Sequence, residues 1–137
     1  MKKIKSCTVI PGAITSEDIP KINDILKNIS MDPNSLIFQH PVDYEAEGLL
    51  DYPTVVKYPM DLSTVRNKLV NSIYTSAQEV IDDIMLIWKN CKIYNIEDSD
   101  IYRCAEYMEK LAKKNIEKYY KVKFLKQNSK KNNFLNN

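Results

Sequence analysis

Residues 76–95 read SAQEVIDDIMLIWKNCKIYN, and this stretch decides the fold because it contains both the start and the buried face of a long helix. Ser76 and Glu79 form a capping box, in which each side chain satisfies a backbone N–H group at the helix start. Apolar residues then recur every three or four positions, the spacing of one helix face. This stripe contains Val80, Ile84, Ile87, Trp88 and Cys91, and is widened by Ile81 and Met85. We therefore predict a largely buried helix that begins after Ser76.

Three further helical periods lie on either side of this stretch. The first follows residues 15–18 as an N-cap region, has Pro20 in its first turn and ends at residues 32–34; its apolar positions are Ile19, Ile22, Leu26 and Ile29. The second begins at Asp61 or Ser63; its apolar positions are Leu62, Val65 and Leu69. The last follows Ser99 and runs to about Tyr120; its apolar positions are Ile101, Ala105, Met108, Leu111 or Ala112, and Ile116. The chain contains two glycines and no sustained β-type alternation, so these patterns predict an all-helical domain.

Residues 33–60 form a long connection without a sustained period. Loops above about 15 residues are uncommon in compact domains and are usually functional or disordered. This one is rich in aromatic and aliphatic residues and contains Pro33, Pro41, Pro53 and Pro59. Disordered linkers lack such apolar residues because they cannot offset the entropy lost on ordering. We expect the segment to fold back onto the helices and form one wall of a ligand pocket.

Charge and composition limit the possible functions. Residues 1–5 carry three lysines and residues 121–137 carry five, with no acidic residue in either segment, so residues 6–120 hold 12 basic and 18 acidic residues, a net charge of −6. A Lys/Asn-rich end is most often a solvated terminus, and the alternative is an arm that binds nucleic acid. No uncharged run approaches the roughly 20 residues of a membrane span, and no signal peptide is apparent. We expect a soluble intracellular protein.

The three cysteines, Cys7, Cys91 and Cys104, share no metal-type spacing. Two of them fall on apolar positions of predicted helices, where reduced cysteine behaves as a small hydrophobic residue. A core role is therefore favoured over a redox or metal role, and we expect no metal site and no cofactor.

Three strings in this order and spacing resemble a bromodomain: residues 38–43 (FQHPVD), 51–64 (DYPTVVKYPMDLST) and 90–95 (NCKIYN). The resemblance covers about residues 16–120, and leaves residues 1–15 as an N-terminal extension and residues 121–137 as a basic C-terminal extension. It implies an all-α fold, a left-handed bundle of four helices named Z, A, B and C. The long ordered segment would be the ZA loop, and residues 96–98 would lie in the short BC loop. The family binds acetyl-lysine, chiefly on histone tails.

The resemblance also implies a binding site. Asn95 would donate a side-chain N–H to the acetyl oxygen, and Tyr52 would reach the same oxygen through an ordered water. The walls would come from Phe38 and Val42 at the methyl end, Leu49 on the ZA side, Tyr94 opposite, and Ile101 as the gate. The chain departs from the family at the rim, where Leu36 and Ile37 replace a frequent Trp-Pro pair and Glu47 stands at an often apolar position. These departures concern peptide choice rather than the acetyl-lysine chemistry.

These residue types suit that chemistry. Acetylation converts a lysine cation into a neutral amide with a methyl group, which needs apolar walls and one uncharged donor such as an Asn amide. An unmodified lysine would bring a desolvated charge into the same pocket at a cost of several kcal/mol. Acidic residues in both loops would attract a basic peptide, although they can also be plain solvated charges; they are Asp43, Glu45, Glu47, Asp51, Glu97, Asp98 and Asp100.

Each candidate also has a purely structural interpretation. Asn95 alone would be a helix C-cap, since Asn tolerates the left-handed conformation. Tyr52 and Tyr94 could be core tyrosines whose hydroxyl groups find partners. Val42, Leu49 and Ile101 could serve packing alone. His40, the one histidine, has no partner in a catalytic spacing.

We therefore expect a non-enzymatic reader of acetylated H3 or H4 tails in nuclear chromatin complexes that regulate transcription. Bromodomains also occur inside acetyltransferases and chromatin remodellers, so an enzymatic domain elsewhere in a parent protein is compatible with this interpretation. No phosphate-binding loop, nucleophile–base pair or metal constellation is visible in the sequence. The alternative is a nucleic-acid-binding helical domain that uses residues 121–137.

Overall fold

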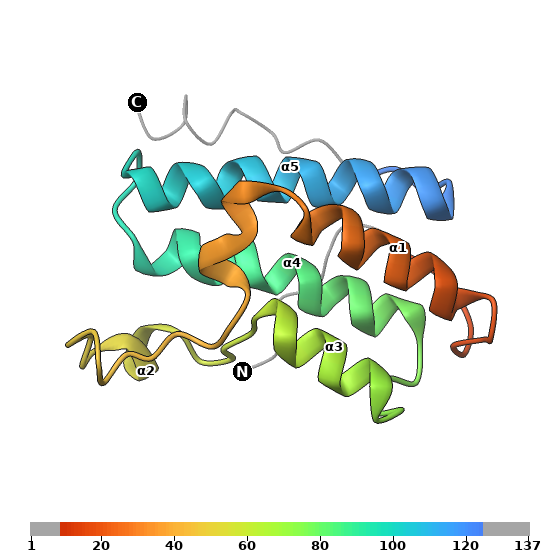
Figure 1. Ribbon diagram of the computed structural model, residues 1–137, viewed down its shortest axis with the longest axis horizontal. Helices are drawn as coiled ribbons and strands as arrows, with labels where there is room; N and C mark the ends of the chain where they lie inside the picture. The colour runs from red at the N-terminus through yellow and green to blue at the C-terminus, as the bar shows by residue number, and fades with distance from the viewer. Residues whose placement is uncertain (1–8, 125–137) are drawn as a thin grey trace, which may run out of the picture.

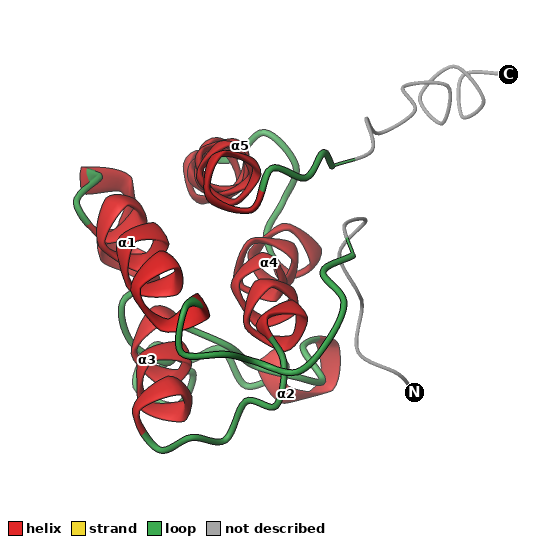
Figure 2. Cartoon of the chain, turned by 90° about the vertical axis from the view of Figure 1, so that its right-hand side faces the viewer, coloured by secondary structure: helices red, strands yellow, loops and turns green. Residues whose placement is uncertain are grey.

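The computed structural model describes residues 9–124, and all regular structure in that range is helical. Four helices lie side by side: α1 (Asp18–Ser30), α3 (Leu62–Val70), α4 (Ala77–Tyr94) and α5 (Asp100–Tyr120) (Figure 1). Seen end-on, they occupy the four corners of a bundle (Figure 2). The predicted all-α four-helix bundle is confirmed, and these four helices correspond to Z, A, B and C.

The core of the bundle is built around α4, which contacts α1, α3 and α5. Trp88, at the middle of α4, is completely buried, and Phe38 packs edge-on against it with ring centroids 5.1 Å apart. Such edge-to-face aromatic pairs add to the stabilisation that comes from burying apolar area. The core role predicted for Trp88 is therefore confirmed.

Three helix starts lie where the local sequence predicts them. Ser76 and Glu79 form the capping box of α4, with both side chain to backbone contacts at 3.2 Å. Asp61 caps α3 by accepting from the Thr64 backbone N–H, and Ser99 caps α5 by accepting from the Tyr102 N–H. Each cap satisfies a backbone donor that has no partner within the helix.

The start of α1 lies within the predicted N-cap region, residues 15–18, but it is not capped by the side chain of the N-cap residue itself. Its N-cap residue is Glu17, whose side chain makes no capping hydrogen bond. Instead the Asp18 carboxylate accepts from the Thr15 backbone N–H at 2.7 Å and from the Thr15 hydroxyl at 3.0 Å. The predicted apolar stripe of α1 is wrong at its first position, because Ile19 is exposed and Ile25 is buried instead. The helix is rotated to bury Ile22, Ile25, Leu26 and Ile29 against α5 and α4.

The ZA loop contains two short helices that the sequence pattern does not indicate, η1 (Pro33–Phe38) and α2 (Tyr52–Val55). The expected packing onto the bundle is confirmed for Phe38, Tyr52 and Val56, which are buried. It is wrong for Leu50, which is exposed. The loop is thus anchored at a few buried positions, with Met60 partly buried against the core and Tyr44 stacked on Tyr52.

Several expectations concern the chain as a whole. Cys91 is buried and Cys104 half-buried, both as free thiols, whereas Cys7 lies outside the described residues. Within residues 9–124 no group of His, Cys, Asp and Glu side chains is arranged to hold a metal ion, and no helix is long and apolar enough to cross a membrane. Most of the basic segment 121–137 lies outside the described part, so its nucleic-acid role and the domain limits 16–120 stay predictions.

Candidate binding pocket

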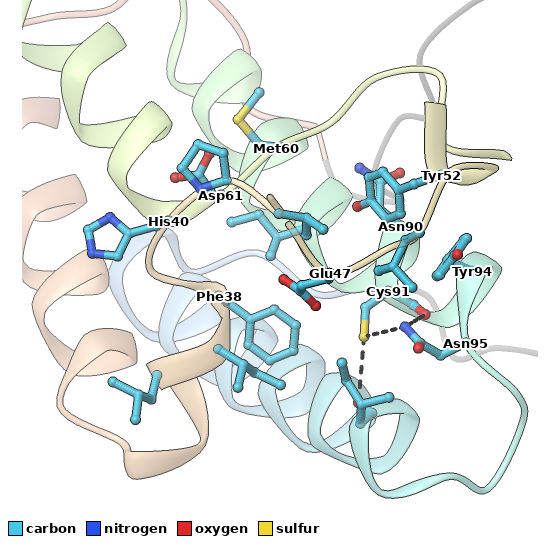
Figure 3. A pocket seen from close by; sticks show the side chains of 17 residues that line it. Phe38, His40, Glu47, Tyr52, Met60, Asp61, Asn90, Cys91, Tyr94 and Asn95 are labelled. Atoms are coloured by element: carbon cyan, nitrogen blue, oxygen red, sulfur yellow. Dashed lines mark hydrogen bonds between the residues drawn. The ribbon is translucent and has the colours of Figure 1, made fainter. Parts of the chain in front are cut away.

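A cavity of about 470 Å³ lies between the ZA loop and the ends of α4 and α5 that meet at the BC loop (Figure 3). The structure brings all ten predicted site residues to this one cavity: Leu36, Ile37, Phe38, Val42, Glu47, Leu49, Tyr52, Tyr94, Asn95 and Ile101. They come from four segments up to 65 positions apart. Their convergence is a structural finding, and their roles toward a ligand stay predictions.

Asn95 follows the last residue of α4 and is held by a local hydrogen bond. Its Nδ2 atom donates to the Cys91 carbonyl oxygen at 2.9 Å and lies 3.5 Å from the Cys91 sulfur (Figure 3). Its backbone is extended, with φ −96° and ψ 155°, rather than left-handed as a simple C-cap would suggest. Because a primary amide nitrogen carries two N–H groups, one can fix the side chain while the other donates to a ligand.

Two ionisable groups at the cavity are shifted further toward their neutral forms by their surroundings. Burial raises the pKa of Tyr52 to about 12, with further contributions from Cys91, Tyr94 and Glu47. Burial also raises the pKa of the Cys91 thiol to about 11, against the opposing hydrogen bond from Asn95. Both groups therefore remain uncharged at neutral pH, and the thiol is a poor nucleophile. This part of the cavity offers weakly polar contacts rather than charge.

Aromatic side chains join the ZA loop to the end of α4. The Tyr52 ring meets the Tyr94 ring at 4.8 Å in an edge arrangement and stacks on Tyr44 at 6.0 Å. The Tyr94 hydroxyl donates to Asp51 Oδ1 at 2.6 Å, and this hydrogen bond is the main reason why the pKa of Tyr94 is raised. These contacts fix the cavity wall between residues more than 40 positions apart.

Seven lining residues were not predicted as site residues: His40, Pro41, Met60, Asp61, Ile87, Asn90 and Cys91. Ile87 and Cys91 could have been found, because they lie eight and four positions before Asn95 and so share its helix face. Asn90 was less predictable. Its side chain is buried and donates to the Tyr58 carbonyl oxygen at 2.8 Å, which ties the ZA loop to α4.

The rim carries negative charge. The seven acidic residues predicted in the two loops are all exposed in the structure. Glu47 alone among them also lines the cavity, where its side chain is seen in Figure 3. Exposed carboxylates around an apolar cavity attract cationic ligands from solution and raise their encounter rate.

The cavity is largely apolar, and it brings the Asn95 amide together with two neutral groups, the Tyr52 hydroxyl and the Cys91 thiol. This suits a neutral amide with an aliphatic stem, and an ammonium group there would lose its hydration without gaining a partner. Within the described residues, the cavity contains no nucleophile paired with a base and no candidate metal ligands in a cluster.

Comparisons with known proteins agree with this geometry. The family model described as Bromodomain matches residues 22–107. The nucleosome-remodeling factor subunit NURF301 of Drosophila melanogaster is 35% identical over 96 residues, which are 70% of this chain and 4% of that protein. A bromodomain-containing protein of Schizosaccharomyces pombe is 36% identical over 64% of this chain and 12% of its own length.

A third relative, transcription factor GTE11 of Arabidopsis thaliana, is 36% identical over 63% of this chain and 14% of its own length. The matched part of the chain thus spans only a small fraction of these relatives. The family match covers most of α1, all of α3 and α4, and the cavity residues from Leu36 to Ile101, so it includes the whole site described above. The chain belongs to the bromodomain family, whose members are acetyl-lysine reader modules rather than enzymes.

Proposed function

We propose that this domain binds acetylated lysine in the tails of histone H3 or H4 and thereby anchors a nuclear, chromatin-associated protein that takes part in transcription regulation. The observation that carries the proposal is the position of Asn95, which lines a largely apolar cavity and whose amide is fixed by a hydrogen bond to the Cys91 carbonyl oxygen. Its second N–H donates to the acetyl oxygen, and Tyr52, as a neutral hydroxyl, holds a water on the same oxygen.

The remaining predicted residues serve the stem and the methyl group. Phe38 is held by Trp88 and closes the methyl end together with Val42. Leu49 and Tyr94 face the aliphatic stem, and Ile101, partly exposed at the start of α5, gates the entrance. The peptide residues next to the acetyl-lysine contact the rim of the cavity, which is formed by Leu36, Ile37 and Glu47.

The choice of histone tails rests on charge and on the relatives. A lysine- and arginine-rich tail complements the acidic rim, which increases its association rate at low ionic strength. One relative is a subunit of a nucleosome-remodeling factor and another is a transcription factor. With one side chain inserted, we expect a dissociation constant roughly between micromolar and millimolar.

The first prediction concerns Asn95→Ala, measured by calorimetry with acetylated and unmodified H3 and H4 tail peptides. We expect wild type to bind acetylated peptides at least about tenfold more tightly than unmodified ones. The variant should lose at least about tenfold in affinity for acetylated peptides, because the buried acetyl carbonyl oxygen of the peptide would be left without a hydrogen-bond donor. Equal binding of both peptide forms, or full affinity of the variant, would contradict the proposal.

Asn71 provides a matched control within the chain. It is the C-cap residue of α3, and its Nδ2 atom donates to the Asn67 carbonyl oxygen at 2.8 Å, the same local bond that Asn95 makes. Asn71 is exposed and does not line the cavity. Asn71→Ala should therefore show a similar small loss of stability but bind acetylated peptide like wild type.

A further inference from the structure

A second cavity, of about 420 Å³, adjoins the acetyl-lysine pocket on the side of the BC loop. Tyr94, Asn95 and Ile101 line both cavities and so form their common wall. The other five residues line the second cavity alone: Asp51 and Val55 of the ZA loop, Ile93 at the end of α4, and Ile96 and Ser99 of the BC loop.

The chemistry of the second cavity is aliphatic. Four of its eight residues are branched aliphatic side chains, and Ile96, directly after Asn95, is 82% exposed. The polar lining groups already have partners within the fold. Asp51 accepts from the Tyr94 hydroxyl, Ser99 caps α5, and the Asn95 amide is bonded to Cys91. An apolar group entering here would cover exposed aliphatic surface without breaking these bonds.

We infer that this cavity binds an apolar side chain of the acetylated peptide, one or two positions from the acetyl-lysine, and so selects among acetylated sequences. This inference rests on the proposed function. Consecutive Cα atoms of a peptide lie 3.8 Å apart, so a peptide with its acetyl-lysine in the first cavity places its neighbours over the adjoining one. Aliphatic and aromatic residues are favoured there, and an acidic residue is disfavoured because it loses hydration and meets the Asp51 carboxylate.

The size of the surface favours a peptide side chain over a second copy of the chain. A stable protein–protein interface involves roughly 20–30 residues on each side. The second cavity offers eight lining residues, three of them shared with the acetyl-lysine pocket. A dimer formed here would also cover the entrance to that pocket and compete with the peptide.

The inference is tested with synthetic peptides that carry one acetyl-lysine flanked by glycine, and with derivatives that have Leu, Phe, Ser or Asp at each position up to two residues away. We expect at least one position where Leu or Phe binds about 3- to 10-fold more tightly than glycine, and where Asp gives no gain. Ile96→Ser and the isosteric Val55→Thr should lose this preference and keep the wild-type affinity for the glycine-flanked peptide.

Val70→Ser is the matched control, because Val70 is a similarly exposed aliphatic residue, 81% exposed, at the end of α3 and outside both cavities. It should retain the preference. Equal affinity for all flanking residues, or an unchanged preference in Ile96→Ser and Val55→Thr, would overturn the inference.

Two further results would distinguish self-association from a failure of the proposed acetyl-lysine binding. Self-association in sedimentation velocity that Ile96→Ser abolishes, without any flanking preference, would assign the surface to a second copy and overturn the inference. Failure of the proposed function looks different: the glycine-flanked acetylated peptide would then bind no better than its unmodified form, and Asn95→Ala would make no difference.

Discussion

Tyr52 illustrates how position determines what a single side chain offers to a ligand. The residue is only 6% exposed, its ring lies against Tyr44 and Tyr94, and burial raises the pKa of its hydroxyl to about 12. A tyrosinate would repel a carbonyl oxygen, whereas the neutral hydroxyl can donate a hydrogen bond to a water. The same residue supports the wall through its ring and the ligand through its oxygen.

Tyr52→Phe separates these two contributions. The ring contacts remain, so we expect the melting temperature to change little, while the affinity for acetylated peptide falls about 2- to 10-fold, the effect of one hydrogen bond. Calorimetry and thermal unfolding measure the two quantities. Tyr44→Phe is the control, because Tyr44 stacks on Tyr52 without lining the cavity. An equal loss of affinity in both variants would argue against a water-mediated role for the Tyr52 hydroxyl.

A buried carboxylate, that of Asp83, links α3 to α4 through side-chain contacts. Asp83 of α4 is 1% exposed; it pairs with Lys68 of α3 at 2.7 Å and accepts from the Tyr74 hydroxyl at 2.7 Å. The Lys68 ammonium also lies 4.7 Å from the centre of the Tyr74 ring. Burial of an ion pair has a large desolvation cost, so we expect this cluster to fix the relative position of the two helices more than it strengthens their association.

Removing Asp83 alone should therefore destabilise the fold, whereas replacing both Lys68 and Asp83 with apolar residues should destabilise it much less. We expect Asp83→Ala to lower the free energy of unfolding by about 2–4 kcal/mol, because it leaves Lys68 and Tyr74 without their acceptor in a largely buried position. The double variant Lys68→Met, Asp83→Leu should recover much of this loss. Urea titration measures both, and a single variant as stable as wild type would refute a structural role for the pair.

Across the whole molecule, carboxylates at three helix starts connect stability to pH. Hydrogen bonds from the Tyr107 hydroxyl and the Asn34 N–H hold the pKa of Asp32 below its ordinary value, and bonds from Thr75 do the same for the pKa of Glu79. Burial pushes the pKa of Asp18 upward, but bonds from Thr15 and Tyr120 outweigh it, so this pKa is also lowered. Each group is thus more acidic in the folded than in the unfolded protein.

A group whose pKa is depressed on folding contributes stability above its unfolded pKa and loses it as the pH falls through the folded pKa. Unfolded carboxyl groups titrate near 4, so we expect full stability above about pH 5 and a steady decrease toward pH 3. Urea midpoints measured from pH 7 to pH 3 check this. Glu79→Gln keeps an acceptor but cannot titrate, and should flatten the decrease; a variant with the wild-type slope would exclude Glu79 as a contributor.

The sequence by itself determined the class of fold and most helix limits. Capping boxes, N-cap side chains and apolar stripes act within one or two turns, so the starts of α3, α4 and α5 follow from neighbouring residues. The bromodomain resemblance named ten cavity residues, because these residues lie within or within a few positions of three short strings whose order is visible in the sequence. Asn95 belongs to one of these strings, and its position directly after the end of α4 makes it the C-cap residue of that helix.

Only the tertiary structure decided how those strings meet. The ZA loop has no period, so the burial of Tyr52, the exposure of Leu50 and the bond from Tyr94 to Asp51 depend on a path that long-range packing selects. The burial of Ile25 in place of Ile19 is a second case, because it depends on how α1 is rotated about its axis against the neighbouring helices. The second cavity arises only where two loops and two helix ends converge, and local sequence rules contain no information about such distances.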